Sequence, residues 1–416
     1  MDLNQSLTGL SSQIDLAFLI ANHNLPTPLY EANSSVDISS YALYDITDNM
    51  INLYAISNVQ EIRTEIELNN VRNNLSGKYT LLNDITLTSA TLDTTEGWLP
   101  IGDNSMFGGI FQGNNYKING LWINRPSTNN IGFFGYIRNA QIKNLGVEIN
   151  GEVKGDQNVG GIAGYVQNSN IANSYGAGNV SGSYYVGGIA GYIHTSNIAN
   201  SYSTGNINGS YYIGGIVGQM FTNGNIANSY WAGNVNGSTN IGGIAGYAGN
   251  SNIINSYSKG NVNGNQYIGG IVGTVNLNSN VTNSYGTGNV SGDGVAGGQP
   301  SFAGGIAGYV TSSALLVRYN VAINPSVIGI GISYVNRIVG GFDSNSISDN
   351  FALNTMRVND NAVSNSNLNG EGKSEADLKT KSTYESLGWG FGDDNANPWK
   401  IDENKNNGFP YFYWQE

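Results

Sequence analysis

Cysteine is absent from the 416-residue chain, and charged residues, proline and histidine are scarce. The lack of cysteine excludes disulfides, thiolate metal sites and a cysteine nucleophile. Charged residues make up 11% of the chain, against roughly 25% in ordinary globular proteins. A formal net charge of −12 argues against a nucleic-acid-binding protein, which needs a basic face. No apolar run approaches the ~18 residues of a membrane-spanning helix, so we expect no membrane insertion of this chain.

Residues with catalytic or metal-binding chemistry are equally sparse. The two histidines, His23 and His194, lack the neighbours of a His-Glu-x-x-His zinc motif. The carboxylate pairs Asp393–Asp394 and Glu371/Glu375 lie in polar segments, where such groups are usually solvated rather than set in a cleft. The Gly-rich strings lack the Lys-Ser/Thr of a phosphate-binding loop. We therefore expect no enzyme activity, no metal and no cofactor.

Glycine, by contrast, is abundant, and Gly-Gly doublets mark an internal repeat between Val159 and Tyr309. Successive doublets are separated by 27, 27, 28, 27 and 35 residues. Within each unit, short Ile, Val and Tyr stretches alternate with Gly, Asn and Ser, a pattern typical of strands joined by tight turns. A helical repeat would need about 33 residues or more. The sequence predicts an all-β parallel solenoid of roughly ten coils, with about three strands per coil and equivalent residues ~4.8 Å apart.

Stacked coils place equivalent side chains in columns. We expect an apolar core column formed by Ile162, Ile189, Ile216, Ile244 and Ile271. An amide ladder is expected from Asn173, Asn200, Asn228, Asn255 and Asn283. An aromatic ladder is expected from Tyr175, Tyr202, Tyr230, Tyr257 and Tyr285. Like charges stacked in this way would repel, and from Gln157 to Val317 only Lys259 and Asp293 are charged.

Other tyrosines are predicted to face water, and they form the candidate binding surface. Three of them follow the core strand (Tyr165, Tyr192, Tyr247), and three precede the glycine doublet (Tyr185, Tyr212, Tyr267). Exposed tyrosine rows can stack on sugar rings, and asparagine amides can bond to hydroxyl groups. The alternative is that these tyrosines only cover the strands and stack on one another.

The repeat divides the chain into four parts. Residues 1–55 have no assigned role. Residues 56–76 are predicted to form an amphipathic helix, starting at Asn58 and Glu61, that plugs one end of the solenoid. Residues 77–350 form the solenoid, which is clearest over 159–310. Residues 351–416 are predicted to be an aromatic C-terminal cap, with Trp389, Phe391, Trp399, Phe409, Tyr411 and Trp414.

Several of these motifs resemble a known family. Gly-Gly-Ile-Ala-Gly-Tyr at 160–165 resembles the GLUG repeat of bacterial surface proteins. The segments 75–87 and 399–414 resemble the sequences that precede and follow such repeats. The resemblance implies a right-handed parallel β-helix displayed outside the bacterial cell on adhesins and haemagglutinin-like proteins. It transfers no catalytic residue to this sequence.

These observations together predict a non-enzymatic adhesin or binding region at the bacterial cell surface or outside the cell. Its expected partners are glycans or host and extracellular-matrix proteins, and further domains of a longer exported chain. One alternative is a structural stalk that holds other domains away from the cell. A weaker alternative is a polysaccharide-cleaving enzyme, with a groove near the basic residues Lys117, Arg125, Arg138 and Lys143.

Overall fold

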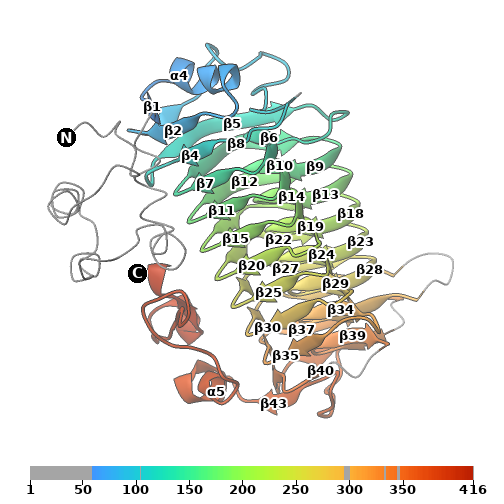
Figure 1. Ribbon diagram of the computed structural model, residues 1–416. Coiled ribbons are helices and arrows are strands. Elements are labelled where there is room, and N and C mark those ends of the chain that lie inside the picture. Colours follow the sequence, from blue (N-terminus) through green and yellow to red (C-terminus); the bar gives the residue numbers. More distant parts are fainter. Residues whose placement is uncertain (1–58, 104, 295–299, 332–333, 344–346, 416) are drawn as a thin grey trace, which may run out of the picture.

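The computed structural model describes residues 59–103, 105–294, 300–331, 334–343 and 347–415, and it is a β-solenoid (Figure 1). Strands of successive coils pair in parallel, and the register joins equivalent residues of the repeat, such as Ala163 with Ala190. The predicted fold class is therefore confirmed.

Four sheets run along the solenoid, and a complete coil contributes to each of them. One 11-stranded sheet has the order β1 (Val59–Ile62), β2 (Lys78–Leu81), β4 (Ile110–Gln112), β7 (Gln141–Lys143), β11 (Asn170–Ala172), β15 (Asn197–Ala199), β20 (Asn225–Ala227), β25 (Asn252–Ile254), β30 (Asn280–Thr282), β35 (Leu316–Arg318) and β40 (Ile347–Ser348). An 8-stranded sheet contains β6 (Phe134–Arg138), β10 (Ala163–Gln167), β14 (Ala190–His194), β19 (Val217–Phe221), β24 (Ala245–Gly249), β29 (Val272–Asn276), β34 (Ala307–Val310) and β39 (Val339–Phe342). A 7-stranded sheet contains β9 (Gln157–Gly160), β13 (Tyr184–Gly187), β18 (Tyr211–Gly214), β23 (Thr239–Gly242), β28 (Gln266–Gly269), β33 (Phe302–Gly304) and β38 (Tyr334–Asn336).

The remaining sheet is split into shorter strands. It comprises β3 (Ile85–Thr86), β5 (Lys117–Asn124), β8 (Gly146–Lys154), β12 (Tyr175–Ser181), β16 (Tyr202–Thr204), β17 (Ile207–Asn208), β21 (Tyr230–Ala232), β22 (Asn234–Asn236), β26 (Tyr257–Ser258), β27 (Asn261–Gly264), β31 (Tyr285–Gly286), β32 (Val290–Gly292), β36 (Val321–Ala322), β37 (Ser326–Gly329), β41 (Phe351–Leu353), β42 (Arg357–Val358) and β43 (Glu371–Lys373).

The glycine doublets explain why each coil has more strands than the three predicted. A doublet separates β9 from β10 and each later pair of the same kind, so the chain turns from one sheet into the next at that point. A Cβ on Gly161 would lie 2.5 Å from the carbonyl oxygen of Gly188 in the next coil. Only glycine permits this close approach of two backbones.

In the last coil, Arg337 takes the place of the second glycine of the doublet. A side chain fits there because no further coil places its own glycine doublet against this position. The N–H of Gly305 in the preceding coil donates to the carbonyl oxygen of Arg337. The Arg337 guanidinium Nη2 donates to Asn365 Oδ1 at 2.9 Å and to the Gly370 carbonyl oxygen at 3.1 Å. Burial lowers the pKa of this guanidinium. The side chain thus ties the end of the solenoid to the segment that follows it.

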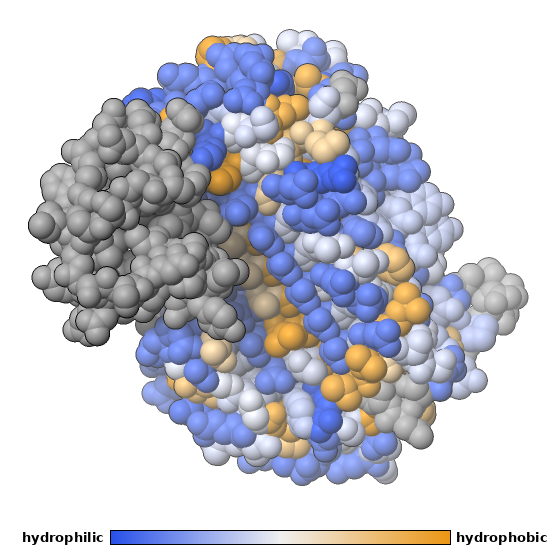
Figure 2. Space-filling model, in the orientation of Figure 1, coloured by the Kyte–Doolittle hydropathy of each residue, from blue (hydrophilic) through white to orange (hydrophobic). Residues whose placement is uncertain are grey.

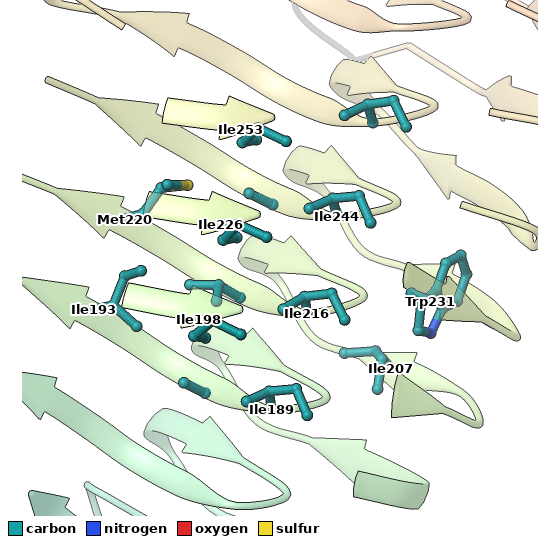
Figure 3. Close-up of a cluster of buried hydrophobic side chains, with 14 of the residues drawn as sticks. Ile189, Ile193, Ile198, Ile207, Ile216, Met220, Ile226, Trp231, Ile244 and Ile253 are labelled. Atoms are coloured by element: carbon teal, nitrogen blue, oxygen red, sulfur yellow. The ribbon is translucent and has the colours of Figure 1, made fainter. Parts of the chain in front are cut away.

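The core column of isoleucines is confirmed. Ile162, Ile189 and their equivalents are fully buried, and Figure 3 shows Ile189, Ile216 and Ile244 stacked in successive coils. Each isoleucine continues the column below it, so the core has the same cross-section through the middle coils. Burying a side chain of this size is worth about 1.5–3 kcal/mol.

The turn between the 11-stranded sheet and the split sheet shows which residues of the repeat's second strand point inward. Asn173 has a φ of +50°, which ends β11 and turns the chain before β12. As a result Ser174 points inward and is buried, whereas Tyr175 lies on the outer surface and is half-buried. Asparagine tolerates this left-handed backbone better than most residues.

The predicted amide ladder is present in part, and a second ladder is more continuous. Asn228 is bonded to both Asn200 and Asn255, at 3.2 Å each. On the first sheet, unbroken amide bonds of 2.7–2.8 Å join Asn170, Asn197, Asn225, Asn252 and Asn280. This second row was missed, although asparagine recurs three residues before Asn173 in most coils.

The N-terminal helix is shorter than predicted and starts later. Residues 59–62 form strand β1, which pairs with β2 and satisfies its backbone on the first coil. The helical part comprises α4 (Glu65–Asn69) and η3 (Asn70–Asn73). Its capping box is Thr64 with Glu67. Of the predicted start, Asn58 lies outside the described residues and Glu61 belongs to β1.

Within this helical part, Leu68 and Val71 are buried against the core, whereas Ile66, assigned by the sequence to the apolar face, is 50% exposed. The pairing of β1 with β2 makes a strand of the residues predicted to form the first helical turn. The apolar face predicted for the helix therefore loses the residues of that turn.

The aromatic C-terminal segment lies along the side of the coils, rather than only across the last one. After η4 (Asp377–Lys379) and α5 (Lys381–Glu385), residues 389–415 form a strap that runs back beside the solenoid (Figure 1). The strap contains β44 (Trp399–Lys400), η5 (Asn406–Gly408), β45 (Tyr411–Phe412) and η6 (Tyr413–Gln415).

The strap covers the later part of the tyrosine ladder that Tyr175, Tyr202, Tyr230, Tyr257 and Tyr285 form. The ladder rings stack in parallel, with centroids 4.8–5.0 Å apart. Phe412 lies 5.3 Å from the ring of Tyr257, and Trp399 lies 5.8 Å from that of Tyr285. The predicted aromatic ladder is therefore confirmed, with a cover that the sequence did not indicate.

Candidate functional site

All six tyrosines of the predicted binding surface lie where the 7-stranded and 8-stranded sheets meet. Five of them belong to one continuous group of rings, which we call the aromatic corner: Tyr136, Tyr165, Tyr184, Tyr185, Tyr192, Tyr211, Tyr212 and Tyr247. The sixth, Tyr267, belongs to a separate group with Phe302, Tyr309 and Tyr334. Between the two groups, Asn240 and Thr274 take the aromatic positions and hydrogen-bond to each other at 2.5 Å.

The corner is held together by both stacked and edge-on contacts. Tyr165 stacks on Tyr192 with centroids 5.1 Å apart, and Tyr185 stacks on Tyr212 at 5.2 Å. Edge-on contacts link the two rows, with Tyr185 against Tyr192 at 5.6 Å and Tyr212 against Tyr247 at 5.9 Å. Contacts of this geometry are each worth about 0.5–1.5 kcal/mol beyond the area they bury.

Three of these tyrosines have a backbone conformation that is costly for them. Tyr185, Tyr212 and Tyr267 have φ of +55°, +59° and +57°. The equivalent residues Asn158 and Asn240 have φ of +55° and +61°. A non-glycine residue in this left-handed region costs about 1–3 kcal/mol, and asparagine is better tolerated there than a bulky side chain. The tyrosines therefore carry strain that asparagine would reduce, which points to a role outside the fold.

The corner offers ring edges and hydroxyl groups more than ring faces. Because Tyr165 and Tyr192 stack on each other at 7°, their shared faces are closed to a sugar ring. Partial burial raises the pKa of Tyr192 to about 12 and also raises the pKa of Tyr165 and Tyr185. Their hydroxyl groups stay protonated at neutral pH and can both donate and accept hydrogen bonds. A sugar cannot enter between these two rings, so their edges and hydroxyl groups are the parts open to a ligand.

The most exposed rings of the corner are Tyr184 and Tyr211, which the sequence analysis did not select. They are 38% and 39% exposed and stack on each other at 4.8 Å. Their register neighbours are Gln157 and Thr239, so the aromatic row ends on both sides of the pair. Each ring therefore keeps one face that no neighbouring aromatic ring covers. Their position as the first residue of each Tyr-Tyr pair was the signal available in the sequence.

The carboxylate pairs considered for catalysis take part in local ion pairs and hydrogen bonds. Asp393 pairs with Lys400, and Glu371 pairs with Lys373 at 2.7 Å. Asp394 accepts hydrogen bonds from the backbone of Ala396 and Asn397, and the bond from Asn397 lowers its pKa. Glu375 pairs with Lys379 at 2.7 Å.

Of the two histidines considered for a metal site, His23 lies outside the residues that the structure describes. Within the described part of the chain, no three His, Cys, Asp or Glu residues are grouped to hold a metal ion. His194, at the end of β14, has its Nδ1 within 3.1 Å of the hydroxyl of Thr195.

The GLUG motif matches residues 182–208 and 237–263. The chain carries GLUG repeats. The first matched repeat includes both Tyr-Tyr rings of β13, and the second includes Tyr247 of the corner. Four rings of the aromatic corner thus lie in matched GLUG repeats, namely Tyr184, Tyr185, Tyr192 and Tyr247. The resemblance to GLUG repeats is confirmed.

A segment of 88 residues, 20% of this chain, is 46% identical to a protein of Evansella cellulosilytica named "Putative Gly-rich membrane protein". The match spans 10% of that protein's length. In the described ranges of our chain, no helix is long and apolar enough to cross a membrane. The GLUG repeats and the solenoid fit a surface or repeat protein.

Proposed function

We propose that this protein is a non-enzymatic binding region displayed on the bacterial cell surface, and that its aromatic corner contacts glycans or host proteins. The observation that carries the proposal is the placement of Tyr185 and Tyr212 in a left-handed backbone where other coils use asparagine. Selection for stability alone would favour asparagine at these positions. Strain kept at a partly exposed aromatic cluster is typical of a site that recognises a ligand.

The chemistry of the corner suits neutral, hydroxyl-rich ligands. Its hydroxyl groups form hydrogen bonds, and the uncovered faces of Tyr184 and Tyr211 can stack on a sugar ring or an apolar side chain. From Gln157 to Val317 the only charged residues are Lys259 and Asp293. Recognition therefore rests on shape and hydrogen bonding rather than on ion pairs.

Display outside the cell is supported by the GLUG repeats and by the name of the Evansella cellulosilytica relative, which describes a membrane protein. Because the match covers a small part of that protein, we treat the surface location of the present chain as part of the proposal.

The test uses an array of glycans and extracellular-matrix proteins probed with the purified chain. The double variant Tyr185→Asn/Tyr212→Asn removes two rings and installs the residue that Asn158 and Asn240 supply in equivalent turns. We expect it to fold normally and to lose at least about tenfold in affinity, equal to about 1.4 kcal/mol. Tyr319→Asn is the matched control, because Tyr319 also has a positive φ (+63°) but lies in another turn.

Equal binding by the double variant and the parent chain would refute the corner as the site. Failure of the parent chain to bind any array member at micromolar concentration would favour the stalk instead. The stalk has its own support in the unbroken amide ladder from Asn170 to Asn280, which stiffens the solenoid along its axis.

A further inference from the structure

A groove opens on the side of the solenoid where the strap comes to an end. The groove has a volume of about 460 Å³. One wall is formed by the start of the tyrosine ladder, Tyr175 and Tyr202, and the strap residues Tyr413 and Trp414 close one end. The other wall is the row of asparagine turns, which includes Asn115, Asn144, Asn173 and Asn200. This side carries the tyrosine ladder and not the aromatic corner.

The strap shows which kind of ligand these walls bind. Along the later coils, it packs aromatic side chains against the ladder, with Trp414 5.9 Å from Tyr230 and Phe412 5.3 Å from Tyr257. An asparagine turn holds the strap's main chain, because Asn228 Nδ2 donates to the carbonyl oxygen of Asn395 at 3.1 Å. The occupant is thus an extended peptide that inserts aromatic rings and offers its carbonyl groups.

The groove repeats both walls in the coils where the strap ends. Tyr175 stacks on Tyr202 at 4.8 Å, the same spacing as under the strap. Asn200 and Asn173 occupy the turn of their own coils that is equivalent to the turn of Asn228. Their φ values are +49° and +50°, and that of Asn228 is +50°. The strap also runs toward this region, because Trp399 contacts Tyr285 whereas Trp414 contacts Tyr202.

Two further features concern the ends of the groove. The buried indole N–H of Trp414 has no hydrogen-bond partner among the described residues, at the end where an incoming carbonyl group would arrive. Beyond the other end, Lys117 and Glu148 lie 3.8 Å apart and balance each other's charge. The groove thus favours a neutral, aromatic segment over a strongly charged one.

We infer that this groove binds an extended peptide segment of a partner protein, with an aromatic side chain packed against Tyr175 and Tyr202 and its main chain held by the asparagine turns. The bound segment extends the path of the strap by about two coils. The inference is independent of the binding proposed for the aromatic corner, because the two sites share no residue.

The probe is a fluorescent peptide with the strap sequence of residues 409–415, titrated into the full chain and followed by anisotropy. We expect saturable binding, and at least about a tenfold loss of affinity in Tyr175→Ser. The matched control is Tyr334→Ser, which removes an exposed tyrosine stacked on Phe302, outside the groove and the aromatic corner, and should leave the affinity unchanged. A peptide with its aromatic residues replaced by serine should not bind.

A second variant keeps the test valid if Tyr175→Ser unfolds. Asn200→Gly removes the amide and retains the left-handed turn, because glycine adopts positive φ without strain. We expect it to weaken the peptide several-fold, whereas Asn283→Gly, in the same turn of a later coil, should not.

Photo-crosslinking then locates the bound peptide. Crosslinks to residues 115–202 support the inference. Crosslinks confined to the coils of Tyr230 to Tyr285 would show displacement of the strap and overturn it. No binding at millimolar peptide, or displacement of the peptide by neutral oligosaccharides at the same groove, would also overturn the assignment to a peptide.

Discussion

Two rows of tyrosines run along the solenoid with nearly the same ring spacing, and their surroundings differ. In the tyrosine ladder, Tyr257 and Tyr285 are fully buried because the strap packs on them. In the aromatic corner, Tyr184 and Tyr211 are more than a third exposed. The comparison teaches that the repeat itself produces stacked aromatic rows, and that a covering segment decides whether a row is buried in the fold or stays open to solvent.

Backbone conformation separates the rows a second time. Among the ladder tyrosines none is found with a positive φ, whereas Tyr185 and Tyr212 in the corner have it. The ladder rings thus stabilise the fold without local strain. The corner rings are retained despite the strain, which is why we assign the recognition role to the corner.

The largest expected difference between the rows is in stability. Tyr257→Ala should lower the free energy of unfolding by about 3–5 kcal/mol, because it leaves a cavity under Trp399 and Phe412. Tyr192→Ala, in the half-exposed corner, should lower it by about 1–2 kcal/mol. Urea unfolding followed by circular dichroism measures both. Equal losses would show that the strap does not stabilise the row it covers.

Alkaline titration should separate the rows next. Burial raises the pKa of Tyr192 to about 12 and that of Tyr285 well above its ordinary value. A tyrosine whose pKa in the folded state lies above the unfolded value of about 10 stabilises the fold. This stabilisation is complete below pH 10 and is lost as the pH rises further. The free energy of unfolding should therefore fall from pH 10 to 12.

The readout of that titration is phenolate absorbance at 295 nm, recorded together with circular dichroism. Tyr192→Phe should remove part of the absorbance that appears before unfolding, and Tyr285→Phe should remove only absorbance that appears with unfolding. Ionisation of Tyr285 while the fold is intact would contradict the view that the strap shields the ladder.

A smaller effect is expected when corner tyrosines are replaced by asparagine. Tyr185→Asn/Tyr212→Asn should change the free energy of unfolding by less than about 1 kcal/mol, because relief of backbone strain offsets the lost stacking. Tyr202→Asn/Tyr230→Asn in the ladder has no strain to relieve and should be clearly destabilising. Thermal unfolding of the two double variants compares them, and a similar loss in both would remove the argument from strain.

Ionic strength should have the smallest effect. Raising NaCl from 50 to 500 mM should change binding at the aromatic corner by less than about twofold, because Lys259 and Asp293 are the only charged residues from Gln157 to Val317. Array binding repeated at the two salt concentrations measures this. A tenfold loss at high salt would move the site to the charged ends of the chain, near residues such as Arg125 and Arg138.

Much of the fold could be predicted because each coil repeats the same sequence pattern. The isoleucine column, the tyrosine ladder and the position of the candidate tyrosines all follow from a period of about 27 residues. The bounds of the N-terminal helix did not follow, because Val59 to Ile62 pair with a strand nearly 20 residues further on. Helical spacing in the sequence carries no information about that pairing.

The candidate site was predicted in its position and not in its details. The sequence pointed to Tyr165, Tyr185 and Tyr192 as neighbours, and the structure brings their rings together. The sequence did not reveal which ring faces are covered by stacking, or that Tyr184 and Tyr211 are the most exposed tyrosines of the corner. Exposure depends on both flanking coils, so it cannot be read from one repeat.

The sequence by itself determined the coil and its columns, since these rest on contacts between residues one period apart. The tertiary structure alone decided which tyrosine row is covered. The contact of Tyr257 with Gln415 joins residues 158 positions apart, and the strap shares no period with the coils. Such packing depends on the shape of two finished surfaces, and that shape exists only once the coils have stacked.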